Sequence, residues 1–137
     1  MNKSLLPWTK LVLAVSAIVQ CVFGLIGLLA PQVMHELLWP PPFQPVPVLW
    51  IRFDAVLYLA MSLGAVYALR QNNWVAVRAY LVIAGLYIAM GLILNIVAVL
   101  VPPGAPPIVW LYLALSVVYL PLVVLVWGQE AARANLV

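Results

Sequence analysis

One acidic residue, Asp54, stands inside an apolar run of the sequence at 48–69. A carboxylate near the centre of a bilayer costs about 2.5–3.5 kcal/mol on insertion scales, so an acid in such a run is a candidate binding residue. Tyr58 follows four residues later and shares the same helix face. At about 1.5 Å of rise per residue, Asn95 and Tyr112 reach the depth of Asp54 in their own runs, and Gln20 lies nearer the midplane.

Two hypotheses fit these polar side chains. In the first, they line a pocket that opens to the outer leaflet and binds a lipid headgroup, a quinone or a proton; the candidate residues are Asp54, Tyr58, Asn95, Tyr112, Gln20 and Arg52. In the second, Asp54 accepts hydrogen bonds from Tyr112, Asn95 or Arg52 and only fixes the helices against one another. Gln20 and Asn95 also suit hydrogen bonds between helices in lipid.

Arg52 has a separate interpretation because it lies only two residues from Asp54 and points to another side of the helix. Its long aliphatic stem allows the guanidinium to reach the outer headgroups. The alternatives are binding of a lipid phosphate or of a partner's carboxylate.

The sequence carries no recognisable catalytic or metal motif. His35-Glu36 does not extend to the His-Glu-x-x-His pattern because residue 39 is Trp, and the chain has one histidine and one cysteine. There is no dinucleotide fingerprint, no phosphate-binding loop and no Ser-His-Asp set, which disfavours an enzyme. No motif indicates a metal or a cofactor, although a quinone, a lipid, or a pigment whose metal is held by His35 would suit an apolar chain.

The composition is typical of a membrane protein rather than of a water-soluble one. Of 137 residues, 68% are hydrophobic and 7% charged, and the mean hydropathy is +1.19. A water-soluble domain is about half apolar and a quarter charged. Runs at 10–30, 48–69, 75–101 and 108–127 are each long enough to cross about 30 Å of hydrocarbon. We therefore predict a single all-α domain, an integral membrane four-helix bundle. The net charge of +3 is too small and scattered for nucleic-acid binding.

The cations predict the orientation. Four crossings place both termini and the 70–78 connection on one side, which then holds five of the six cations, Lys3, Lys10, Arg70, Arg78 and Arg133. The positive-inside rule puts this side in the cytoplasm, with the chain in the plasma (inner) membrane. The six tryptophans fall three to each predicted interface, as in an aromatic belt.

The connections differ on the two sides. The polar residues at 70–73 predict a tight turn between the second and third spans. The outer loops, 31–47 and 102–107, are short and rich in proline, and the first begins with a short amphipathic segment that Pro40-Pro41-Pro42 would end. Both outer loops lead into similar tetrapeptides, Pro47-Val48-Leu49-Trp50 and Pro107-Ile108-Val109-Trp110. This similarity suggests a repeat of two helical hairpins.

Small residues recur along the spans at helical spacing, as expected where helices pack closely in lipid. The first span has Ser16, Gln20, Gly24 and Gly27 on one face, and the second has Ala60, Gly64 and Ala68. These faces are the predicted contacts of the bundle.

Three short motifs follow one another in the first half of the chain. Phe23-Gly24 and Pro31 close the first span, Trp50-Ile51-Arg52-Phe53 enters the second, and small residues fill 60–68. In this order they resemble the small bacterial four-helix membrane proteins grouped as DoxX-like. Asp54-Ala55 departs from the pattern, which has a glycine soon after the arginine. The resemblance implies a four-helix fold, and its members linked to oxidoreductases are membrane partners of quinone-coupled enzymes.

The sequence favours two functions over an enzyme or pigment-binding subunit that uses a cofactor and over a homo-oligomeric channel. The first is a non-catalytic accessory or scaffold subunit that packs its apolar faces against a larger membrane complex, or against copies of itself. The second is a protein that binds a lipid, a quinone or another small molecule in the pocket around Asp54. Both involve membrane lipids as neighbours.

Overall fold

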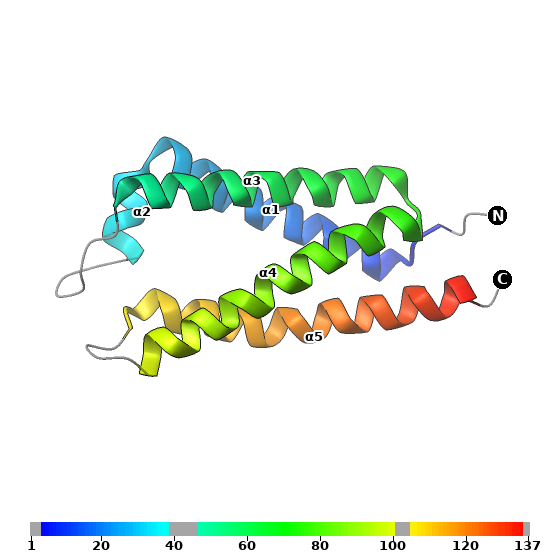
Figure 1. The fold of residues 1–137 in the computed structure, drawn as a ribbon. Helices are drawn as coiled ribbons and strands as arrows, with labels where there is room; N and C mark the ends of the chain where they lie inside the picture. Colours follow the sequence, from blue (N-terminus) through cyan, green and yellow to red (C-terminus); the bar gives the residue numbers. More distant parts are fainter. Residues whose placement is uncertain (1–3, 39–46, 101–104, 136–137) are drawn as a thin grey trace.

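The computed structural model describes residues 4–38, 47–100 and 105–135. These residues form α-helices and short connections: α1 (Pro7–Leu29), α2 (Pro31–Leu38), α3 (Val48–Gln71), α4 (Trp74–Leu100) and α5 (Pro107–Asn135). Four of the helices are long and apolar enough to cross a membrane, and α2 is the short one (Figure 1). The predicted all-helical fold with four long apolar helices is thus confirmed, and the short amphipathic segment after the first span is helical. The predicted stop at Pro40–Pro42 lies outside the described residues.

Local sequence explains where the helices begin and end. Three of them, α1, α2 and α5, start with a proline, which lacks the N–H group that the first turn leaves unpaired. The turn after α3 contains Asn72, whose left-handed φ of 47° ends the helix. Asn73 then caps α4, because its Oδ1 accepts the Ala76 N–H at 3.0 Å. The predicted turn between the second and third spans is therefore a pair of asparagine caps.

The fourth span is longer than predicted. The sequence placed its end at residue 127, and α5 continues to Asn135. Residues 129–134 are strong helix formers, and one of them, Glu130, is buried in contacts with α1. The helix therefore includes the charged residues Glu130 and Arg133.

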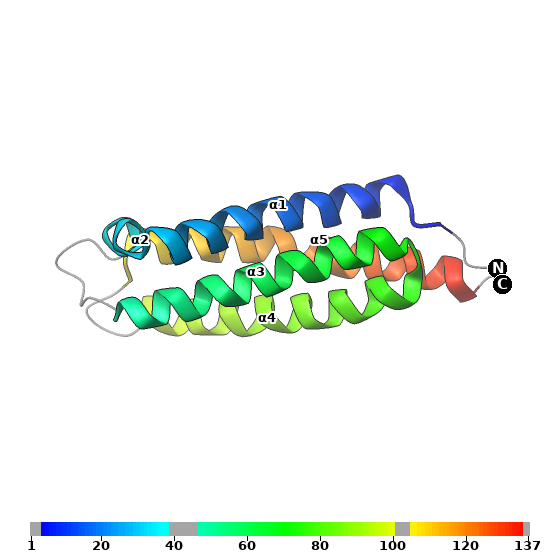
Figure 2. The ribbon, with the colours of Figure 1, turned by 90° about the horizontal axis from the view of Figure 1, so that it is seen from above.

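The four long helices form two pairs. Helix α1 packs chiefly on α3 and α4 chiefly on α5, while the two pairs contact each other much less. Figures 1 and 2 show the α1–α3 pair as one layer and the α4–α5 pair as the other, with both termini at the end opposite α2. The ribbons of the two layers diverge toward α2 (Figure 1).

Glycine permits the close approach of α1 to α3. Both Gly24 and Gly27 are buried, and a Cβ at Gly24 would lie 2.6 Å from Leu59 Cγ and 2.9 Å from the Ala55 carbonyl oxygen. The Ser62 hydroxyl, also buried, donates to the Ala17 carbonyl at 2.8 Å. The small-residue face predicted for the first span is therefore a helix contact.

The core is concentrated in one half of the bundle. Its main cluster joins the first half of α1, the second half of α3, the first half of α4 and the second half of α5; the members from these helices are Val12, Leu13, Ala17, Met61, Ala65, Ala68, Val77, Tyr80, Leu81, Ala84, Val123 and Val126. The half near α2 has only a small cluster around Met34 and Ile51 among the described residues. The two layers are thus tightly packed against each other near the termini and loosely near α2, where the close contact at Gly24 and Gly27 lies within the α1–α3 layer.

A buried carboxylate joins the two layers at the packed end. Glu130 is 4% exposed, and its Oε1 accepts the Leu6 N–H at 2.9 Å and the Thr9 hydroxyl at 2.7 Å. Its Oε2 lies 3.5 Å from Arg133 Nη1. Negative charge at the start of a helix is favoured by the helix dipole. Glu130 therefore satisfies donors at the start of α1 from a position on α5.

The close packing at Gly24 leads to a first prediction. Gly24→Ala should lower the free energy of unfolding by about 1–3 kcal/mol, because the added methyl group meets the Ala55 backbone and forces α1 from α3. Gly91→Ala is the matched control, since a Cβ there meets nothing within 4 Å. Thermal unfolding in mild detergent compares the two variants. Equal unfolding midpoints for them would contradict this account of the α1–α3 contact.

A second prediction concerns Glu130. Glu130→Ala should reduce stability by about 1–3 kcal/mol for each buried donor that it leaves unpaired. Glu130→Gln should cost less, because its amide oxygen still accepts from Leu6 or Thr9. Glu36→Ala, at an exposed residue of α2, is the control and should have little effect. The measurement is the unfolding midpoint in detergent; similar midpoints for Glu130→Ala and Glu36→Ala would refute the role given to Glu130.

Candidate functional site

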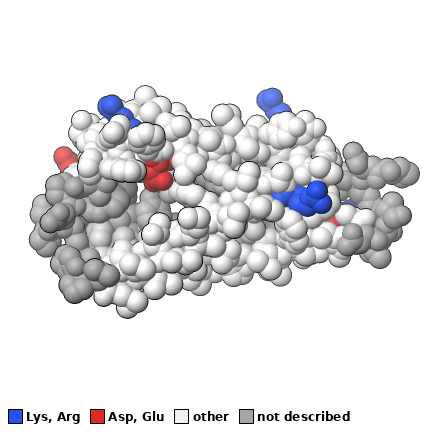
Figure 3. All heavy atoms as spheres, in the orientation of Figure 1, with Lys and Arg blue, Asp and Glu red and all other residues white. Residues whose placement is uncertain are grey.

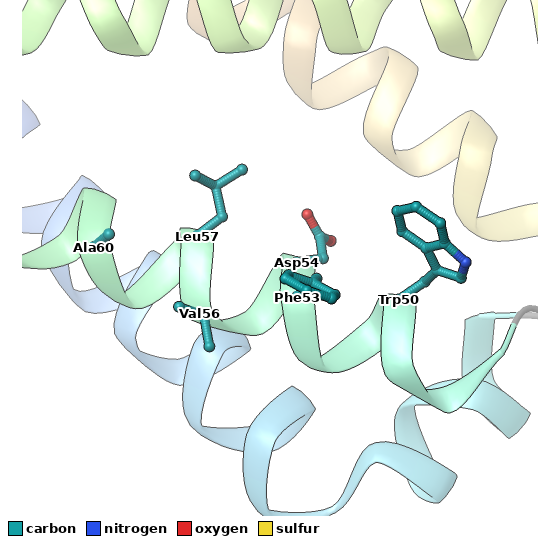
Figure 4. A pocket seen from close by; sticks show the side chains of 6 residues that line it. All are labelled: Trp50, Phe53, Asp54, Val56, Leu57 and Ala60. Carbon is teal, nitrogen blue, oxygen red and sulfur yellow. The ribbon is translucent and has the colours of Figure 1, made fainter.

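A groove runs along α3 in the loosely packed half of the bundle. It has a volume of about 570 Å³ and is lined by Trp50, Phe53, Asp54, Val56, Leu57 and Ala60, which we call the Asp54 groove. In Figure 4 the Asp54 carboxylate points from α3 into the space toward α4 and α5, between the side chains of Trp50 and Leu57. Among the described residues, Asp54 is the only charged side chain of a lining that is otherwise mainly apolar.

Asp54 is held by a tyrosine of the neighbouring helix. The Tyr87 hydroxyl, on α4, donates to Asp54 Oδ1 at 3.2 Å. The Tyr87 ring also packs edge-on against Tyr58, with ring centroids 6.2 Å apart. This contact bridges the two layers where they otherwise touch little.

Aromatic rings surround the carboxylate. Tyr58 packs on Phe23 of α1, with ring centroids 6.0 Å apart, and Trp50 packs on Phe53 at 6.2 Å. The side chains of Tyr58 and Tyr112 interact electrostatically with Asp54 and with each other. The site thus combines one carboxylate with rings from α1, α3, α4 and α5.

Two tyrosine hydroxyls remain without a well-formed hydrogen bond to any described residue. They belong to Tyr112 and Tyr119 on α5, and both oxygen atoms are buried. A buried hydroxyl without a partner costs free energy, and such groups are uncommon in a finished interior. Tyr112 therefore retains hydrogen-bonding capacity beside the Asp54 groove.

The structure brings together only part of the predicted site. Asp54, Tyr58 and Tyr112 lie near one another. Gln20 lies elsewhere, with its Oε1 3.5 Å from the Tyr80 hydroxyl, and so it serves as a link between α1 and α4. Asn95 is half-buried on α4, and Arg52 is exposed on α3.

The predicted donors to Asp54 were wrong. The sequence suggested Tyr112, Asn95 or Arg52, and the observed donor is Tyr87. Matching depths by residue rise ignored two facts: α4 crosses the bundle obliquely (Figure 1), and a tyrosine side chain reaches several ångströms beyond its backbone. A residue nearer the midplane therefore reaches the carboxylate.

Sequence reasoning also missed the aromatic walls of the site. Tyr87 was not among the predicted site residues, and Trp50 was predicted only as one of the interfacial tryptophans. Ala60, expected in a helix contact, is exposed in the groove. The spacing Trp50-Phe53-Asp54-Leu57, one face of a helix at i, i+3, i+4 and i+7, was the available signal.

The remaining chemical candidates stay apart. Within the ranges that the structure describes, no three His, Cys, Asp or Glu side chains gather closely enough to hold a metal ion. His35 is half-buried on α2, and Cys21 is a free, half-buried thiol on α1. Figure 3 shows few charged side chains on the face drawn, with acidic atoms beside a hollow in it.

A third prediction tests the link between Asp54 and Tyr87. A double-mutant cycle of Asp54→Ala and Tyr87→Phe should give a coupling free energy of about 0.6 kcal/mol, and at most about 1.7 kcal/mol, the range measured for hydrogen bonds between membrane helices. Tyr67→Phe provides the control cycle with Asp54→Ala, because Tyr67 is exposed and lies about 20 Å along α3 from Asp54. Unfolding in detergent gives the free energies. A Tyr87 coupling no larger than that of Tyr67 would mean that the hydrogen bond contributes nothing.

Comparison with known proteins adds no relative. No family model, no curated protein and no solved structure matches the chain. The resemblance to DoxX-like proteins stays a prediction that rests on the motifs alone.

Proposed function

We propose that this chain is a multi-pass membrane protein that binds a small amphipathic molecule in the Asp54 groove. One observation carries the proposal. The Asp54 side chain is exposed at the groove, receives one hydrogen bond, from Tyr87, and forms no ion pair with any described residue. A carboxylate in hydrocarbon is costly and is retained where it has a partner, so a ligand is the natural complement.

The groove suits a molecule with a polar head and an apolar body. Asp54 offers hydrogen-bond acceptors, while Val56, Leu57 and Ala60 offer only apolar surface. Its volume of about 570 Å³ falls within the range of about 300–1,000 Å³ typical of small-molecule sites. We propose binding rather than catalysis, because the groove contains a single reactive group.

The proposed setting is the plasma (inner) membrane, with both termini in the cytoplasm. The cation distribution supports this orientation, and it places the Asp54 groove in the outer half of the bilayer. Membrane lipids are then the immediate neighbours of the groove.

A second candidate is an accessory subunit that packs against a larger membrane protein or against copies of itself. The observation that favours it is the poor burial of α4 and α5, whose most apolar windows are only 6% and 11% buried within the chain. Small extramembrane connections agree with a protein whose contacts lie within the bilayer.

Native mass spectrometry of the protein, extracted in mild detergent, separates the two candidates. A binding protein should retain a discrete extra mass, and Asp54→Asn should release most of it because the carboxylate is lost while the fold persists. Glu36→Gln is the control, since Glu36 is another exposed acid that does not line the groove.

The other outcomes are equally informative. Co-release of larger membrane subunits at fixed stoichiometry, with no small ligand, would favour the accessory role. Retention of the same extra mass by wild type and Asp54→Asn would rule out a site built on Asp54.

A further inference from the structure

We propose that the ligand of the Asp54 groove is a lipophilic organic cation. This inference rests on the proposed binding function and adds the chemical class of the ligand. It follows from three features of the groove, namely its unpaired negative charge, its aromatic walls and its apolar floor.

Charge is the first argument. An ionised carboxylate has only acceptor oxygens, and Tyr87 occupies one of the two in Asp54. Arg52 is the nearest cationic residue in sequence, yet two helical positions turn it about 200° away around α3. No Lys, Arg or His of the described ranges lies within ion-pair distance of Asp54. Within the described ranges no side chain neutralises this carboxylate, and a cationic ligand would do so.

Hydrogen-bond chemistry disfavours neutral carbonyl ligands for an ionised Asp54. Quinones and ester lipids present carbonyl oxygens, which are acceptors and meet an acceptor in the carboxylate. The Tyr112 hydroxyl, a donor, is buried and is not part of the groove lining. An ammonium or a delocalised organic cation complements Asp54 directly.

The aromatic walls favour the same charge. Trp50 and Phe53 flank Asp54 in the lining (Figure 4). The ring of Tyr87, whose hydroxyl contacts Asp54, packs edge-on against Tyr58. Aromatic faces attract cations through their quadrupole, and Trp is the strongest of them. The remaining lining, Val56, Leu57 and Ala60, provides apolar contact for the body of the ligand. Together these contacts select a bulky cation over a small hydrated ion.

The test uses two hydrophobic ions of similar size and opposite charge, tetraphenylphosphonium and tetraphenylborate. Binding of each labelled ion is measured by equilibrium dialysis to the protein in phosphatidylcholine nanodiscs, with empty nanodiscs subtracted. The wild type should bind the phosphonium saturably and the borate not at all. Asp54→Asn should weaken phosphonium binding by about ten- to hundredfold, the range expected when a charged partner is lost.

Two further variants guard against a folding artefact. Trp50→Leu should weaken phosphonium binding several-fold by removing a cation–π face, with the carboxylate intact. Glu36→Gln, outside the groove, should bind as the wild type does. Each variant is compared after size-exclusion chromatography shows a single folded species.

The outcomes distinguish this inference from the proposed function. Equal binding of both ions, or phosphonium binding that survives Asp54→Asn, would overturn the cation as ligand. If phosphonium fails to bind while a neutral mass is retained in native mass spectra and lost in Asp54→Asn, the binding function stands and the cation is wrong. If the phosphonium does not bind and no neutral mass is retained, both proposals are wrong.

Discussion

The Glu130 carboxylate is the contact on which the rest of the bundle depends. In lipid, burial of apolar surface contributes little to helix association. Close packing and hydrogen bonds between helices must therefore stabilise the bundle. Glu130 accepts from Leu6 and Thr9 at the start of α1 while belonging to α5, and Asn72 in the α3–α4 turn accepts the Leu5 N–H at 3.2 Å. Elements from both layers are thereby fastened at one end, beside the packed aromatic pair Trp74 and Trp127.

These contacts join the two layers at one end of the bundle only. The packing between the layers can therefore differ at the other end. Near the termini, thirteen buried apolar residues form one cluster across the four long helices and the segment before α1. Near α2, the layers diverge, and the Tyr87–Asp54 hydrogen bond bridges them. Stability and chemistry are thus separated along the bundle axis. The packed half holds Glu130, a buried carboxylate that accepts from two donors, and the open half holds Asp54, which receives one hydrogen bond, from Tyr87.

The sequence was informative wherever a property is local to one helix. Apolar runs gave the four spans, Gly24 and Gly27 gave the face of α1 that packs on α3, and a lone acid in a span gave Asp54. Properties that depend on how two helices cross could not be predicted from the sequence. The donor to Asp54 is Tyr87 rather than Tyr112, because the tilt of α4 determines which tyrosine hydroxyl lies within hydrogen-bond distance of the carboxylate. Glu130 was not among the predicted contact residues, since only the docking of α1 buries it. Its position three residues before Arg133, in an unbroken run of helix formers, was the one local hint.

The side of α3 on which the Asp54 groove opens has a consequence for how a ligand would reach it. Trp50 and Phe53, at its rim, are more than 60% exposed, and in a bilayer that exposure is to lipid rather than to bulk water. A ligand would arrive by lateral diffusion within the leaflet. Its concentration at the site would be its aqueous concentration multiplied by its partition coefficient, so half-saturation measured in bulk solution would move with the amount of lipid present. Discrimination between ligands would then occur twice, first in the bilayer and afterwards at the carboxylate.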